Sequence, residues 1–140
     1  MTNPLTDARG ALAAALSEGG LKAYTTPPEI PEGDDGPDDA LLPYPLCYVV
    51  PAEPYLDFNA EGLMYGEALL LCNVSVVAAS GASDVEAEQL DEELLKARAV
   101  LAGIPDWTPR QFLQPGRIVI NNAVHLACAI EVSTVVTLEG

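Results

Sequence analysis

Residues 67–80, EALLLCNVSVVAAS, are the stretch that decides the fold. Their side chains alternate as the two faces of a β-strand require. The even-numbered set is wholly apolar from Leu70 to Ala78, whereas the odd-numbered set includes Asn73 and Ser75. This alternation predicts a strand whose even-numbered face points into the core, with the other face partly exposed or covered by a neighbour.

A helix is predicted directly after this strand, from about residue 84 to residue 102. Ser83 and Glu86 have the spacing of a capping box, and acidic residues crowd the first turns. Lys96 and Arg98 are expected in the last turns, where they suit the helix dipole. The expected buried stripe has helical spacing and consists of Leu90, Leu94, Ala97 and Leu101.

Another helix is predicted from about residue 4 to residue 18. Asn3 is a suitable N-cap, Pro4 suits the first helical position, and the Gly19-Gly20 pair ends the helix. Strands are predicted at 22–25, 46–50, 111–113, 117–121 and 124–138.

Helices and strands in this order predict a single α+β domain over residues 1–140, with a mostly antiparallel sheet and two helices on one face. Pro51 is expected to close the strand at 46–50, and residues 54–58 to form an extended connection.

An acidic, Pro-rich loop is predicted at about 27–45. It lacks the spaced acids and closing Glu of an EF-hand, so we expect no specific calcium site there. Its candidate interaction or channel-facing residues are Asp34, Asp35, Asp38 and Asp39.

Charge is the most unusual feature of the composition. The chain has 21 acidic and 6 basic residues and a formal net charge of −15, with no Lys or Arg between Lys22 and Lys96. Nucleic-acid and anionic membrane surfaces are bound mainly by Lys and Arg, so this composition disfavours both partners. No segment has the length and apolarity of a membrane span, and the first residues have no basic signal-peptide pattern.

Residues that commonly carry catalysis are few. His125, the only histidine, lies in a predicted strand and is expected to be a packed or surface residue. Three separate cysteines without CxxC spacing predict buried, reduced thiols in a protein made in the cytoplasm. We therefore expect no enzyme, no metal and no cofactor. Trp107 and Tyr48 are expected in the core, whereas Tyr55 is a candidate interaction residue.

The whole pattern resembles the tail terminator proteins of long-tailed, siphovirus-type bacteriophages, especially those that infect actinobacteria. The resemblance covers nearly the full length in the order and size of elements. The resemblance rests on four segments of the sequence. The first two are the ALAAAL helix followed by GGLKAY, and the apolar strand at 46–50 followed by Pro51 and Pro54-Tyr55. The others are the strand at 67–80 that leads into the acidic helix, and the unit at 111–136. The acidic insertion at 33–39 is longer than the family leads us to expect.

The resemblance implies a virion protein that forms a ring, usually a hexamer, at the head-proximal end of the tail tube. The ring would stop tube polymerisation and dock the head completion or stopper protein. DNA would pass through without specific binding, because carboxylates repel phosphates. Long strands also offer edges that a neighbouring copy can pair with.

Two other functions stay open at this point. One is a head–tail connector or stopper of similar size and fold. The other is an acidic DNA mimic, whose binding to its partner should collapse at high salt as the charges are screened. A small enzyme or ligand-binding domain is disfavoured because no catalytic motif occurs in the sequence.

Replacing the four aspartates between 34 and 39 with asparagine should leave ring formation intact, if the loop faces the channel or solvent. Sedimentation velocity of the purified variant measures this. Loss of the ring would show instead that the loop makes subunit contacts.

Overall fold

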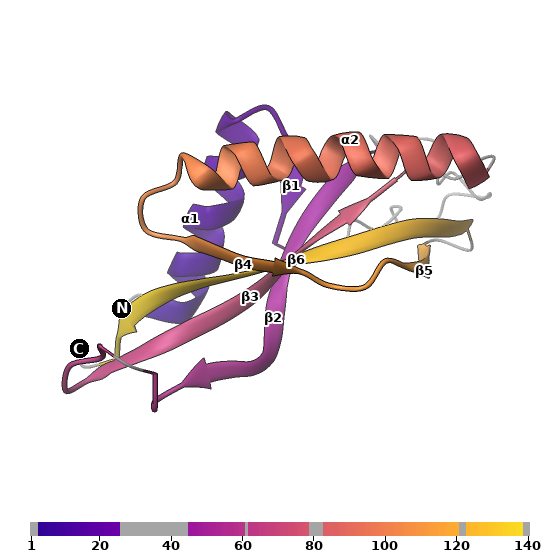
Figure 1. Ribbon diagram of the computed structural model, residues 1–140. Coiled ribbons are helices and arrows are strands. Elements are labelled where there is room, and N and C mark those ends of the chain that lie inside the picture. The colour runs from indigo at the N-terminus through magenta and orange to yellow at the C-terminus, as the bar shows by residue number, and fades with distance from the viewer. Residues whose placement is uncertain (1–2, 26–44, 61, 79–82, 121–122, 139–140) are drawn as a thin grey trace, which may run out of the picture.

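The computed structural model describes residues 3–25, 45–60, 62–78, 83–120 and 123–138 (Figure 1). The predicted acidic loop, including Asp34, Asp35, Asp38 and Asp39, lies outside the described residues. The elements in chain order are α1 (Pro4–Glu18), β1 (Ala23–Tyr24), β2 (Leu46–Asp57), β3 (Glu67–Val77), α2 (Ser83–Ala102), β4 (Thr108–Phe112), β5 (Gly116–Ile120) and β6 (Ala123–Thr137).

The described strands form one six-stranded sheet in the order β1-β2-β3-β6-β4, and β5 also pairs with β6. All pairings are antiparallel except that between β1 and β2. β3 lies in the middle and pairs with β6 from Glu67 to Val77 without a register shift. The chain is therefore an α+β domain with a mostly antiparallel sheet and two helices, as predicted.

The predicted facing of β3 is confirmed. Its even-numbered residues from Ala68 to Ala78 are all buried in the main core cluster. Both helices contribute apolar side chains to the same cluster, so they cover the same face of the sheet (Figure 1). The helix residues that fill it are Leu12, Ala13 and Leu16 of α1 and the predicted stripe Leu90, Leu94, Ala97 and Leu101 of α2.

α1 has the predicted ends. The Asn3 side chain accepts hydrogen bonds from the backbone N–H groups of Leu5 and Thr6, at 2.9 and 3.2 Å. At the other end, a Cβ added to Gly19 would lie 2.5 Å from a methyl group of Val100 in α2. Glycine is therefore needed where the two helices approach, and Lys96 Nζ of α2 donates to the carbonyl of Gly20 at 3.0 Å.

The other face of the sheet carries a second, smaller cluster. Leu46, Val77 and Ala127 are buried there, with Tyr24, Tyr48 and Ile118 packed against them. Tyr48 is thus half-buried in this second cluster, while Trp107 is buried in the main core as expected.

The prediction that the second strand closes at Pro51 is wrong. β2 runs on to Asp57 and includes most of the expected connection, with a register shift against β3 between Pro51 and Leu56. Prolines are tolerated here because β1 pairs with β2 only at Cys47 and Tyr48, so this part of β2 is an edge among the described strands. The peptide bond between Glu53 and Pro54 is cis.

Smaller corrections concern the C-terminal half. β4 begins at Thr108, earlier than predicted. The strand can include Pro109 because β4 is an edge strand with a register shift against β6 at this point. Lys96 and Arg98 do not reach the last turn of α2, so they do not complement the helix dipole there. The bounds of the other strands differ from their predictions by a few residues at most. Where a predicted strand extends beyond the described residues, that part of the prediction lies outside them.

Val74→Asp should abolish folding, because it places an unpaired charge on a fully buried side chain at a cost of several kcal/mol. Ser75→Asp is the matched control, since its half-buried side chain faces the other side of β3. Circular dichroism and thermal melting measure the outcome. A well-folded Val74→Asp protein would refute the assigned facing.

Candidate interaction surfaces

His125 is a packed residue. Its side chain is fully buried, and Nδ1 lies 2.6 Å from the carbonyl oxygen of Ala78. Within the described part of the chain, no group of three or more His, Cys, Asp or Glu residues is placed to hold a metal ion.

The three cysteines are buried and free of disulfide bonds, as the sequence predicted. Burial, with a smaller contribution from the charge of Glu93, raises the pKa of the Cys47 thiol to about 12. Burial also raises the pKa of Cys72 to about 11, against the lowering effect of Arg9. Nucleophilic or metal-binding chemistry needs the thiolate, which these environments disfavour.

One buried carboxylate has a structural partner. The Glu86 side chain is 4% exposed, and Arg117 Nη1 of β5 lies 3.1 Å from its Oε2. The Ser83 side chain is not among those described, so the predicted capping box stays a prediction. The ion pair ties the start of α2 to β5 and satisfies a charge that would otherwise be costly to bury.

Tyr55 lies near the bulged part of β2, half-buried against the main core. The guanidinium carbon of Arg9 is 5.9 Å from the centre of its ring. Burial raises the pKa of the Tyr55 hydroxyl, and the charge of Arg9 opposes this rise. The hydroxyl oxygen has no hydrogen-bond partner among the described residues. Its role as a partner-binding residue stays a prediction.

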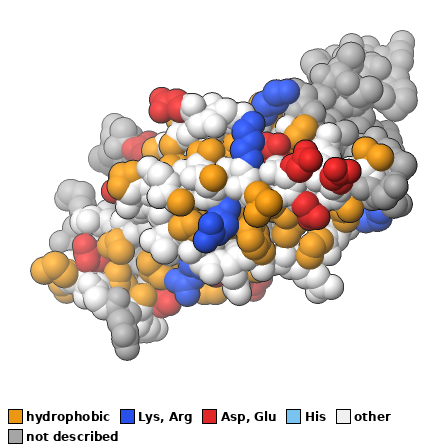
Figure 2. Space-filling model, turned by 45° about the horizontal axis from the view of Figure 1, so that its top comes forward, with side chains coloured by type: hydrophobic (Ala, Val, Ile, Leu, Met, Phe, Trp, Pro, Cys, Tyr) orange, Lys and Arg blue, Asp and Glu red, His pale blue; other side chains and the backbone are white. Residues whose placement is uncertain are grey.

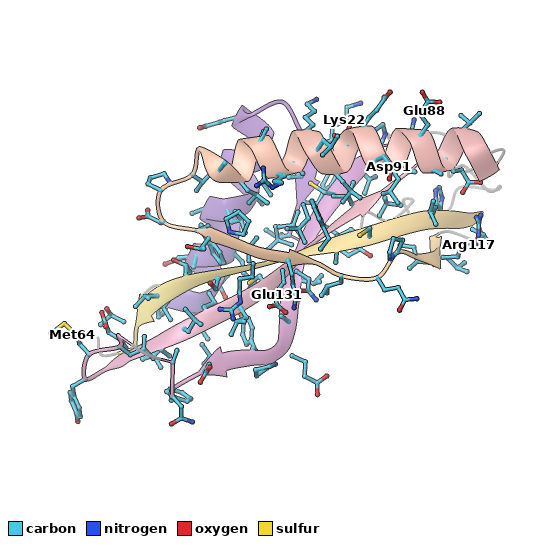
Figure 3. All side chains as sticks on the ribbon, in the orientation of Figure 1. Lys22, Met64, Glu88, Asp91, Arg117 and Glu131 are labelled. Carbon is cyan, nitrogen blue, oxygen red and sulfur yellow. The ribbon has the colours of Figure 1, made fainter. Side chains whose placement is uncertain are left out.

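Three large apolar residues in the connection between β2 and β3 are exposed. Phe58 is 62% exposed, Met64 74% and Tyr65 93%. We call these three residues the aromatic tip. Figure 3 places Met64 at one extreme of the molecule, far from Arg117 at the other end of the sheet. Large apolar side chains with this exposure make the segment a candidate interaction surface.

Local hydrogen bonds hold the backbone of the aromatic tip in place. The Asp57 carboxylate accepts from the Asn59 backbone N–H at 2.8 Å, and the Glu67 carboxylate accepts from that of Met64 at 2.7 Å. Gly66 has a φ of 84°, and its carbonyl accepts from the Leu138 backbone N–H at 2.8 Å. The tip is therefore preorganised rather than a loose loop.

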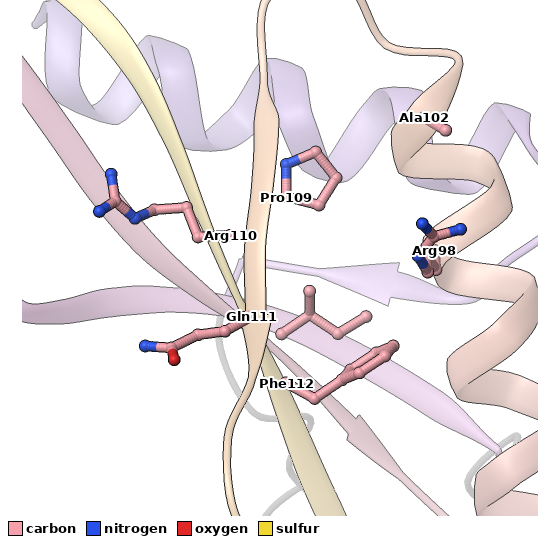
Figure 4. A pocket seen from close by; sticks show the side chains of 7 residues that line it. Arg98, Ala102, Pro109, Arg110, Gln111 and Phe112 are labelled. Atoms are coloured by element: carbon pink, nitrogen blue, oxygen red, sulfur yellow. The ribbon is translucent and has the colours of Figure 1, made fainter.

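A groove of about 440 Å³ lies between the C-terminal half of α2 and β4 (Figure 4). Phe112 projects from β4 toward the helix, where Arg98 stands, whereas Arg110 and Gln111 extend to the other side of the strand. Phe112 is 46% exposed. We call this feature the α2–β4 groove; its lining residues are Arg98, Ala102, Pro109, Arg110, Gln111, Phe112 and Ile130.

Charges of opposite sign are separated along α2. Figure 2 shows acidic side chains gathered over one part of this face and basic side chains over another. Glu88, Asp91 and Glu92 are exposed on the N-terminal half of the helix, and Lys96 and Arg98 on its C-terminal half.

Tyr65 is one of several aromatic residues that the sequence offers as possible interface anchors, but sequence reasoning identified neither the aromatic tip as a unit nor the α2–β4 groove. The Phe58 and Met64-Tyr65 positions were a visible signal, because large apolar residues in a polar, Gly-containing connection are unusual. The groove gave no such signal, since its walls come from segments that meet only in the folded chain.

No model of a known protein family matches the chain, and no curated protein matches it. Within the described residues, no helix is long and apolar enough to cross a membrane.

The three thiols should resist a thiol-reactive dye at pH 8 in the folded protein and react together only after unfolding in guanidinium. Stability should also fall as the pH rises above about 9, because the folded state holds these thiol protons more tightly than the unfolded state does. Dye titration and urea melts at pH 7 and 10 measure both effects. Rapid reaction of the folded protein would contradict the burial of these side chains.

Proposed function

We propose that this protein is a structural component of a bacteriophage virion, a tail terminator that forms a ring at the head-proximal end of the tail tube. In this role it stops tube polymerisation and joins the tail to the head completion protein. It is made in the host cytoplasm and has no enzymatic activity or cofactor.

The observation that carries the proposal is the presence of two different candidate interaction surfaces on one small domain. The aromatic tip is a protrusion, and the α2–β4 groove is a concave site on another part of the chain. Association through two different patches is heterologous, and it gives a closed ring when the rotation between copies closes. A ring is the architecture that the family resemblance implies.

The net charge supports the same role. At −15, the chain repels phosphates, and a channel lined by such subunits would let DNA pass without holding it. The four aspartates at 34–39 would add to this repulsion if they face the channel.

An acidic DNA mimic is the second candidate, because Glu88, Asp91 and Glu92 form an exposed acidic face on α2. A mimic needs carboxylates at phosphate-like spacing along a whole face. Here Lys96 and Arg98 follow on the same helix within about two turns, which interrupts the series. The terminator therefore has the stronger support.

The deciding experiment mixes the purified protein with tail-tube protein from the genome that encodes it. Light scattering after size exclusion should give a ring-sized species, alone or once tubes are present. Negative-stain images should show the ring at one end of each tube, and tubes should stop growing in its presence. The contact should survive in about 0.5 M salt, where exposed charges are screened beyond a few ångströms.

Binding to an assembled head in place of the tube would instead identify the connector or stopper. Binding to neither, with salt-sensitive binding to a nuclease or repressor, would identify the DNA mimic.

A further inference from the structure

We propose that the aromatic tip of one copy docks in the α2–β4 groove of a second copy, which gives a head-to-tail contact. This inference rests on the proposed function only for its context. The contact is supported by the exposure of the aromatic tip and by the lining of the α2–β4 groove.

The tip has the composition of an interface anchor. Tyr, Phe and Met are enriched where protein surfaces meet, and a few such residues carry most of the binding energy. Tyr65 is almost fully exposed in the single chain, so the apolar body of its side chain stays in water unless a partner covers it. The hydrogen bonds from Asp57 and Glu67 to the tip backbone hold it ready for docking, which lowers the entropy cost of binding.

The groove offers what such an anchor needs. Its volume is within the range of sites that hold side chains or small ligands, and Phe112, Pro109 and Ala102 give it apolar walls. Arg98 adds a cation that can lie over an aromatic ring. Among the described residues Arg98 has no ion-pair partner, so its guanidinium group is available for this contact.

Charge favours a tip-to-groove contact over a tip-to-tip contact. The tip is flanked by Asp57 and Glu67, and no Lys or Arg occurs anywhere between Lys22 and Lys96. Two tips would therefore bring like charges together. The groove carries Arg98, whereas Arg110 is paired with Glu131, so Arg98 is the cation that the acidic tip meets there.

The test uses paired cysteines in the full chain. The native thiols are buried with raised pKa values, so engineered surface thiols are the ones that react. Tyr65→Cys and Ala102→Cys place one thiol on the tip and one in the groove. Each variant is treated with a short bismaleimide alone, and then the two are mixed, both with and without tail tubes. Val119→Cys, on β5 and 67% exposed, is the matched control partner for Tyr65→Cys.

Head-to-tail docking predicts covalent dimers when Tyr65→Cys is mixed with Ala102→Cys, and few in either variant alone. The double variant should give a ladder of oligomers. Dimers from Tyr65→Cys alone would overturn the proposal in favour of tip-to-tip contact. Equal yields with the Val119→Cys control, or no mixed dimers with or without tubes, would overturn it as well.

An affinity measurement supports the same distinction. Tyr65→Ala and Arg98→Glu should each weaken self-association about tenfold or more, as loss of an anchor residue does. Val119→Ala should leave it unchanged. Both tested side chains are exposed, so thermal melts should match the parent protein. Unchanged self-association in both variants would overturn the docking contact.

The two proposals fail separately. Rings on tube ends without mixed cross-links would sink the docking contact and leave the terminator function standing. Specific mixed cross-links in a protein that neither binds tubes nor limits their length would overturn the terminator function and leave the docking contact standing. If Tyr65→Ala loses tube binding but keeps self-association, the tip binds the tube protein instead of a second copy.

Discussion

The central position of β3 is the constraint on which the rest of the structure depends. It pairs with β2 on one side and with β6 along its whole length on the other, so its backbone groups are satisfied within the sheet. Its even-numbered side chains are then buried beneath the two helices. Burying each Val or Leu side chain contributes about 1.5–3 kcal/mol, and a shift of one residue would turn the whole set toward the opposite face. The register of β3 therefore also positions the two helices α1 and α2 and the neighbouring strands β2 and β6.

Among the described strands, the free edges of β2 and β4 are poorly suited to pairing with another copy. The long strands β3 and β6 are interior, and the free part of β2 carries Pro51, Glu53 and Pro54, which interrupt an edge or add charge to it. β4, on the other side, is short and includes Pro109. The sequence-based expectation that long strands would offer edges to a neighbour is thus not favoured by this arrangement. Within the described residues, β5 pairs only with β6 and has no proline, so its edge stays available beside the side-chain contacts of the tip and the groove.

Elements with a strong local pattern could be predicted from the sequence. The strand at β3 and both helices follow from alternation, helical spacing and capping residues, and the bounds of α1 match the prediction. β2 could not be predicted in full, because proline normally ends a strand and only its place at an edge, with a bulge, makes Pro51 and Pro54 acceptable. The α2–β4 groove depends on how residues 98–102 and 109–112 meet, and no local pattern encodes that packing.

The few cations of this acidic chain limit which surfaces can meet. Copies with a charge of −15 repel one another, so an interface needs positive charge that is not already used within the chain. Four of the six basic residues have internal contacts: Arg9 with Tyr55, Lys96 with Gly20, Arg110 with Glu131 and Arg117 with Glu86.

Within the described part of the chain, this leaves the side chains of Lys22 and Arg98 without an ion-pair or hydrogen-bond partner. Of these two, Arg98 lines the α2–β4 groove, and the aromatic tip is an exposed apolar surface flanked by carboxylates of opposite charge. The proposed contact pairs this cationic groove with the acidic tip, and charge disfavours contacts between two acidic surfaces. Such a contact joins unlike patches, so it gives a closed ring when the rotation between copies closes and an open filament when it does not.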